Sequence, residues 1–280
     1  LCVLPGMSAL SPLGSKLRAA GVPLALATLL LFTGGNAHAQ LSLPPDYAWR
    51  QLSPAGEAGS NVRAWWEINP RGEWVTFVGD DENTGAEAVS AIRRNGATLH
   101  RLSPYGPAFA VADLDLSPDG RRVLYRGELE TNGLSEAWSA PLAGAPTDAV
   151  KLNLPVVGYG VLAVIEPDQG TRIGYIAETS TGFGFWSVPA AGPAAASLQL
   201  DPGLVVDELI YGGLVAPDGS RAVLFNVTPT TEIASIWSVP LDGPAESGLF
   251  LLEAAPAGCL PHTGAVGSGF LVYALSCDTP

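Results

Sequence analysis

The stretch that decides the fold is LSPDGRRVLY, at residues 116–125. Its first half favours a tight turn, because proline presets φ at the first central position, aspartate hydrogen-bonds its own backbone and glycine accepts a positive φ. Its second half ends in VLY, a run of β-branched, apolar and aromatic residues that is typical of strands. The stretch therefore predicts a turn that leads into a β-strand.

Related turns recur along the chain, at INPRG (68–72), IEPDQG (165–170) and VAPDG (215–219). Their prolines and that of the first turn stand at positions 70, 118, 167 and 217, so the intervals are 48, 49 and 50 residues. After each turn and its strand come two more short strand-like runs. The first of these has the pattern W-S-x-P at residues 138–141, 186–189 and 237–240. A short strand-like run also precedes each turn, so each repeat contains four predicted strands.

Four-stranded antiparallel units of about 40 to 50 residues are typical of β-propeller blades, whose faces are covered only when neighbouring blades pack together. Within residues 40–280, no segment has the apolar spacing of a helix, so the expected class is all-β, a propeller with four full blades. Residues 264–274 predict the first two strands of a partial fifth blade. Either this blade has three strands, or the reading frame is truncated at the C-terminus. Residues 48–52 resemble the outermost strand at 98–102 and are expected to pair beside the fifth blade.

The repeat resembles the TolB-like propeller repeat, also called PD40, which is a WD40-like family. The residues that carry the resemblance are 116–125 together with AWSAPLAG at 137–144. The similarity is strongest in the second and fourth repeats. The first repeat has Arg71 in place of the aspartate, and the third has Gln169 inserted. The resemblance implies a propeller fold, but it says little about function because the matching residues form turns and packing contacts.

Residues 1–39 are expected to be a secretory signal peptide. Lys16 and Arg18 precede an apolar run at 24–32, and an A-x-A motif ends at Ala39. These features are the basic region, apolar core and cleavage site of such a leader. The core is shorter than the about 20 residues that a bilayer span needs, so cleavage is favoured over anchoring and no membrane span is expected afterwards.

The chain is strongly acidic, with 14 Lys and Arg against 27 Asp and Glu and a formal net charge of -13. Because the expected leader contains two basic and no acidic residues, the mature chain has 12 against 27, or -15. This charge repels phosphate backbones, so a nucleic-acid partner is excluded. The expected location is the periplasm or the extracellular space.

Two cysteines, Cys259 and Cys277, remain after the leader is removed, since Cys2 precedes it. In an exported chain they are a candidate disulfide. Two buried free thiols are the alternative. A metal site is not expected at these cysteines, because no CxxC motif or histidine pair accompanies them.

Catalytic machinery is not evident in the sequence. The mature chain has two histidines, His100 in an outer strand and His262 in a connection rich in glycine and proline. No G-x-S-x-G motif is present, so hydrolase chemistry is not expected. Residues 158–163 imitate a G-x-G-x-x-A motif, but no helix follows, which indicates a glycine-rich loop. We therefore expect neither an enzyme nor a cofactor.

Acidic turns offer a possible metal site at 80–85 and 128–133, since calcium takes six to eight oxygen ligands. Neither turn has the spacing of a calcium loop, so we interpret both as solvated hairpin turns and expect no metal. Glu67, Asp113 and Asp115 fall on the predicted innermost strands, where hydrogen bonds to backbone or water are the favoured role.

The leading hypothesis for function is a non-catalytic scaffold that binds a protein or glycan partner in the cell envelope as a monomer. In an antiparallel blade, the turns after the second strand and the connections after the fourth strand emerge on one face. The loops expected on this face are 80–85, 103–109, 155–160 and 201–211. The candidate contact residues are Tyr105, Tyr159, Asp207, Glu208 and Tyr211. The alternative is a propeller fragment of a larger enzyme, such as a peptidase.

Overall fold

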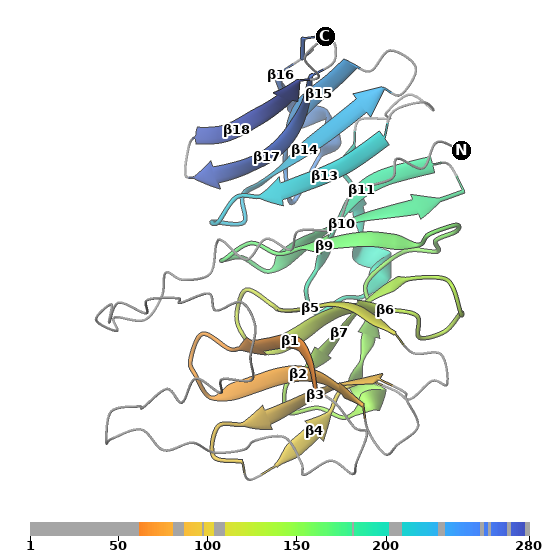
Figure 1. Ribbon diagram of the computed structural model, residues 1–280, viewed down its shortest axis with the longest axis vertical. Coiled ribbons are helices and arrows are strands. Elements are labelled where there is room, and N and C mark those ends of the chain that lie inside the picture. The colour runs from red at the N-terminus through yellow and green to blue at the C-terminus, as the bar shows by residue number, and fades with distance from the viewer. Residues whose placement is uncertain are drawn as a thin grey trace, which may run out of the picture. The chain divides into compact units, whose positions relative to one another are not determined.

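The computed structural model describes residues 62–80, 87–96, 98–103, 110–180, 182–201, 209–228, 233–252, 255–256, 259–267 and 270–277. The expected signal peptide and the segment 48–52 lie outside these ranges. The described chain forms eighteen strands and three one-turn 3-10 helices (Figure 1). None of these helices is long and apolar enough to cross a membrane.

The strands form four antiparallel four-stranded sheets, which we call blades 1 to 4, and a fifth sheet of two strands. Blade 1 contains β1 (Val62–Ile68), β2 (Trp74–Asp80), β3 (Glu87–Arg93) and β4 (Leu99–Arg101). Blade 2 contains β5 (Val111–Leu116), β6 (Arg122–Gly127), β7 (Glu136–Pro141) and β8 (Val150–Lys151). Blade 3 contains β9 (Val161–Ile165), β10 (Arg172–Thr179), β11 (Gly182–Pro189) and β12 (Leu198–Gln199). Blade 4 contains β13 (Leu209–Val215), β14 (Arg221–Thr228), β15 (Ile233–Pro240) and β16 (Leu249–Leu252).

The 3-10 helices join the third and fourth strands in blades 2 to 4. They are η1 (Pro146–Asp148), η2 (Ala194–Ala196) and η3 (Ala245–Ser247).

The fifth sheet contains β17 (Cys259–Gly267) and β18 (Phe270–Cys277). Four full blades and the first two strands of a fifth are therefore confirmed, although β17 begins five residues before the predicted start at residue 264.

The core lies between consecutive blades. The first strand of each later sheet packs against strands of the preceding blade: β5 contacts blade 1, β9 contacts blade 2, β13 contacts blade 3 and β17 contacts blade 4. Buried side chains from both partners meet in each interface, such as Val78 with Val123 and Tyr175 with Leu124. The three W-S-x-P tryptophans are also buried, so they recur at this spacing because each packs within its blade. Burial between neighbours is what a propeller needs, because one blade cannot cover its own faces.

The Pro-Asp-Gly turns adopt the geometry that their sequence predicts. In blade 2, the Gly120 amide donates to the Ser117 carbonyl at 2.8 Å, and Gly120 has φ +63°. The Ser117 hydroxyl donates to Asp119 at 2.6 Å. Partial burial alone would raise the pKa of Asp119, but the hydrogen bonds from Ser117 and from the Arg121 amide lower it below its usual value.

Turns of neighbouring blades touch each other. The Asn69 side chain donates to the Gly120 carbonyl at 3.3 Å, and a Cβ at Gly120 would lie 2.6 Å from Cδ of Pro70. Likewise, a Cβ at Gly219 would overlap the carbonyl oxygen of Gln169 in the preceding blade. The glycine therefore serves both the turn's positive φ and the close approach of the next blade.

An arginine at the start of the second strand holds the W-S-x-P strand in blades 2 to 4. Its Nε donates to the serine hydroxyl and its Nη2 to the same serine's carbonyl. The pairs are Arg122 with Ser139, Arg172 with Ser187, and Arg221 with Ser238. We call this pair the Arg–Ser clamp. In blade 3, the Ser187 hydroxyl also donates to the Leu241 carbonyl of blade 4, so the clamp reaches the next blade.

The end of the fourth strand is fixed by a second repeated device. The Leu152 amide donates to the Ala137 carbonyl at 2.9 Å, and the Ala137 amide donates back to the Asn153 side chain at 2.8 Å. Equivalent bonds involve Ser103 in blade 1 and Asp201 in blade 3. The polar residue that follows the last buried leucine therefore closes each of these three blades.

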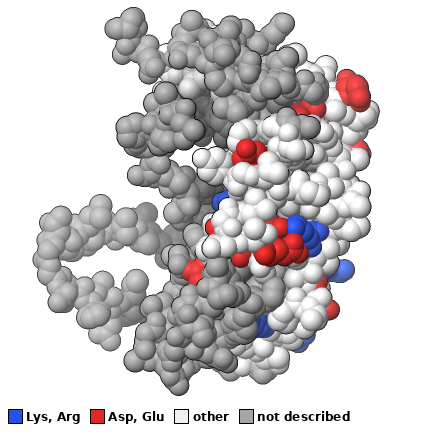
Figure 2. Space-filling view, turned by 90° about the vertical axis from the view of Figure 1, so that its right-hand side faces the viewer, with Lys and Arg blue, Asp and Glu red and all other residues white. Residues whose placement is uncertain are grey.

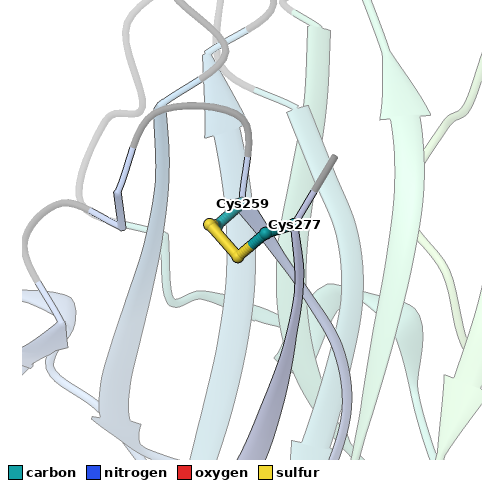
Figure 3. Close-up of a disulfide and its surroundings, with 2 residues drawn as sticks. All are labelled: Cys259 and Cys277. Carbon is teal, nitrogen blue, oxygen red and sulfur yellow. A yellow bond between two sulfur atoms is a disulfide. The ribbon is translucent and has the colours of Figure 1, made fainter. Parts of the chain in front are cut away.

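The two cysteines form a disulfide between β17 and β18 (Figure 3). Cys259 and Cys277 are direct partners in the antiparallel register, and their Cα atoms are 4.0 Å apart. The bond lies at the open end of the hairpin, opposite the end where Gly267 pairs with Phe270. The alternative of two free thiols does not apply to this structure.

Candidate binding surface

The predicted contact residues differ in where the structure places them. Tyr105, Asp207 and Glu208 lie outside the described residues. Tyr211 was predicted to lie in a loop, and this prediction is wrong: β13 begins at Leu209, and the backbone of Tyr211 belongs to that strand. The register with β14 shifts between Ile210 and Gly212, so Tyr211 is the unpaired residue of a β-bulge. Tyr159 is the candidate whose side chain the structure describes, and it is in the predicted connection between β8 and β9.

Tyr159 stands at the tip of a tight turn over residues 157–160, which we call the Tyr159 turn. The Gly160 amide donates to the Val157 carbonyl at 2.8 Å, and Gly158 and Gly160 both have positive φ. The tyrosine side chain is 70% exposed. The glycine-rich motif at 158–163 therefore begins as a loop, as predicted, but its residues 161–163 already belong to β9.

The backbone of the turn is held on two sides. On one side, the Val157 amide donates to the Glu178 carbonyl at 2.9 Å, and the Tyr159 amide donates to the Glu178 carboxylate at 2.9 Å. On the other side, the Val161 amide donates to the Ser135 carbonyl at 2.8 Å, which ties the turn to blade 2. A Cβ at Gly160 would overlap that carbonyl. Tyr159 is therefore a large exposed side chain on a fixed backbone.

The neighbours of Tyr159 include an exposed apolar side chain, the Glu178 carboxylate and, in blade 2, a small mixed-charge cluster. Val157 is 44% exposed beside Tyr159. In the adjoining blade 2, Lys151 forms ion pairs with Glu130, at 2.8 Å, and with the buried Glu136. Burial alone would lower the pKa of Lys151, but these two carboxylates raise it above its ordinary value. On the face shown in Figure 2, red and blue groups likewise lie beside one another within a described surface that is mostly uncharged.

The other residues considered in the sequence have structural contacts. His100 lies on β4, where its Nδ1 is 3.2 Å from the Gly144 carbonyl oxygen and its ring meets Trp74 edge-on. His262 lies within β17 and not in a connection, because the strand extends over Pro261. Asp113 and Asp115 accept hydrogen bonds from the amides of the residues that follow them. Among the described residues, no group of three or more His, Cys, Asp or Glu side chains is placed to hold a metal ion.

One feature was not predicted from the sequence: a cavity in blade 1 lined by Glu73, Trp74, Arg93, Arg94 and Asn95. The signal that could have found it is the departure of blade 1 from the repeat. Trp74 occupies the position of the clamp arginine, and Arg93 occupies the position of the W-S-x-P proline.

No protein family model matches the sequence, and no curated protein matches it. Among solved structures, prolyl oligopeptidase B from Galerina marginata aligns with a TM-score of 0.52 at 11% identity, over 75% of this chain and 33% of that one. A prolyl endopeptidase aligns with a TM-score of 0.52 at 14% identity, over 77% and 32%. TolB from Acinetobacter baumannii gives 0.41 at 13% identity, over 64% and 40%, which is too low to support a conclusion.

These similarities concern the fold alone, and with the four-stranded sheets they make the chain a β-propeller. The matched region spans about a third of the length of each of the two peptidases.

Proposed function

We propose that this chain is an exported, non-catalytic β-propeller of the TolB-like kind that binds a protein partner in the cell envelope through the Tyr159 turn. The observation that carries the proposal is a 70% exposed tyrosine on a backbone fixed by Glu178 and Ser135. Exposed aromatic side chains on rigid supports are typical anchors of interfaces, because they bury a large area and lose little conformational entropy.

The disulfide supports export, since such bonds persist in oxidising compartments. The predicted signal peptide at residues 1–39 supports the same location, the periplasm or the extracellular space. An apolar residue beside the tyrosine and a nearby mixed-charge cluster favour a protein partner over a glycan, because such a combination is typical of protein interfaces. The chain acts as a monomer in this proposal.

The test replaces Tyr159 with a photo-crosslinking amino acid in the exported protein and places the same probe at Tyr273 as a control. Tyr273 is an exposed tyrosine on β18, far along the chain from the Tyr159 turn. We expect one discrete protein adduct from position 159 and none of the same mass from position 273. Tyr159→Ala should weaken recovery of that partner and should change the free energy of unfolding by no more than about 0.5 kcal/mol. An adduct containing sugar alone would indicate a glycan, and no adduct from position 159 would contradict the proposal.

A second candidate function is that of a propeller within a larger peptidase. It is supported by the similarity to prolyl oligopeptidase B and to a prolyl endopeptidase, whose chains are about three times as long as the matched region. In this case a hydrolase domain would be encoded in the same reading frame beyond the codon for Pro280. Sequencing that region tests the idea: a serine hydrolase domain would support it, and an immediate stop codon would oppose it.

A further inference from the structure

Blade 1 contains a surface cavity of about 260 Å³ at the end of the blade where β2 begins and β3 ends. The residues that line it include two arginines, one tryptophan, one asparagine and one glutamate. The lining residues are Glu73, Trp74, Arg93, Arg94 and Asn95. The volume is slightly below the about 300 to 1,000 Å³ of pockets for drug-sized ligands, so the cavity suits a single small group.

The cavity exists where blade 1 departs from the other blades. In blades 2 to 4, the residue at the start of the second strand is the clamp arginine, and it pairs with a proline of the third strand. In blade 1, Trp74 pairs with Arg93, and Ala91 takes the position of the clamp serine. The arginine of this pair in blade 1, Arg93, therefore lies on the third strand and not on the second, and the clamp position of blade 1 offers no serine hydroxyl as an acceptor.

The side chain of Arg93 lies against the ring of Trp74. Its Cζ lies 5.1 Å from the centroid of the Trp74 ring, and His100 packs edge-on against the same ring at 5.4 Å. A cation–π contact uses the face of the guanidinium, whereas its N–H donors point outward in its plane. Within the described ranges, the side chains of Arg93 and Arg94 form no salt bridge and no hydrogen bond. The clamp arginines, by contrast, donate to serine.

The charged residues that line the cavity indicate the charge of the anion that it would bind. Two guanidinium groups and the Glu73 carboxylate give a net charge of +1, which matches a monoanion such as a carboxylate. A dianionic phosphate would be repelled by Glu73. The Glu73 carboxylate accepts hydrogen bonds only, so it suits the hydroxyl groups of a ligand whose carboxylate lies on the arginines. We propose that this cavity binds a sugar acid, a small ring with one carboxylate and several hydroxyls.

The proposal is independent of the Tyr159 turn and is tested on the purified mature chain by ligand-observed NMR and isothermal titration calorimetry. The probe is sodium glucuronate, and the comparison ligands are glucose, sodium acetate and inorganic phosphate. We expect glucuronate to bind more tightly than each of these, because glucose lacks the carboxylate, acetate lacks the hydroxyls and phosphate carries the wrong charge. Binding of phosphate at least as tight as that of glucuronate would overturn the assignment.

Variants locate the site. Arg94→Gln should weaken glucuronate binding by about tenfold or more, the usual effect of losing a charge-assisted hydrogen bond. Arg121→Gln is the matched control, since Arg121 is an exposed arginine at the corresponding end of blade 2, and it should leave affinity within about twofold. Glu73→Gln should weaken glucuronate and strengthen phosphate. Equal affinities of the wild type and Arg94→Gln, or stronger glucuronate binding by Glu73→Gln, would overturn the proposal, and circular dichroism establishes that each variant is folded.

Discussion

Replacing Gly219 with alanine tests whether contacts between turns hold neighbouring blades together. Gly219 has φ +70°, a left-handed conformation that costs an L-residue about 1–2 kcal/mol. The new Cβ would also overlap the Gln169 carbonyl oxygen, which is backbone and cannot rotate away as a side chain could. Overpacking of this kind costs about 1–3 kcal/mol. The expected loss in free energy of unfolding is therefore about 2–5 kcal/mol, the sum of these two effects.

Gly72 provides a matched control in the same turn of blade 1. Its φ is +65°, but a Cβ there would have no atom within 4 Å. Gly72→Ala should therefore cost only the about 1–2 kcal/mol of backbone strain. Alanine also reduces the conformational entropy of the unfolded chain, but this gain is the same at both sites and cancels in the comparison. The difference between the two variants, about 1–3 kcal/mol, measures the contact between blades.

Urea denaturation followed by tryptophan fluorescence measures both variants. The midpoint should fall further for Gly219→Ala than for Gly72→Ala, while the dependence of the free energy on urea stays unchanged. Equal destabilisation by the two substitutions would refute the reasoning, because it would mean that the neighbouring turn moves aside at no cost.

Arg172→Leu removes a clamp and should lower the free energy of unfolding by about 1.5–3 kcal/mol. Arg121→Leu, at the exposed surface, should change the free energy of unfolding by no more than about 0.5 kcal/mol. Similar urea midpoints for the two variants would contradict a stabilising clamp. Denatured mature protein should show no free thiol before reduction and two after it. Breaking the Cys259–Cys277 bond should lower the free energy of unfolding by roughly 3 kcal/mol. An unchanged urea midpoint after reduction would contradict this stabilisation. Asp119→Asn should destabilise the protein at neutral pH, because the folded-state pKa of Asp119 lies below its usual 3.8 and its stabilising effect is present above that pH. The difference in stability between the wild type and Asp119→Asn should disappear as the pH falls through the folded-state pKa. A difference that persists at lower pH in acid titrations would contradict this role of the Asp119 carboxylate.

The fold was largely predictable because its turns are chemically distinctive. Proline, aspartate and glycine at fixed positions define where each blade reverses, and the regular intervals between these turns define the number of blades. The Arg–Ser clamp was not predicted, although Arg122 and Ser139 are both visible in the repeat. Their pairing depends on the register between β6 and β7, which a spacing pattern does not reveal.

The candidate site was predicted only in part. Tyr159 was found because glycines on both sides mark a turn, and a large side chain at a turn tip is exposed. Tyr211 was placed at the end of the predicted connection 201–211, but pairing with β14 extends β13 back to Leu209, so Tyr211 lies within that strand. The cavity around Arg93 was not predicted, because Trp74 and Arg93 depart from the repeat and the repeat pattern indicates only what the blades share.

The position of the disulfide sets the mechanical behaviour of the last sheet. A hairpin normally peels apart from its open end, where the strands are free, but here that end is covalently closed by Cys259 and Cys277. Tension applied beyond Cys277 therefore passes through the sulfur atoms to Cys259 and the segment ahead of β17, and it does not strip β18 from its neighbour.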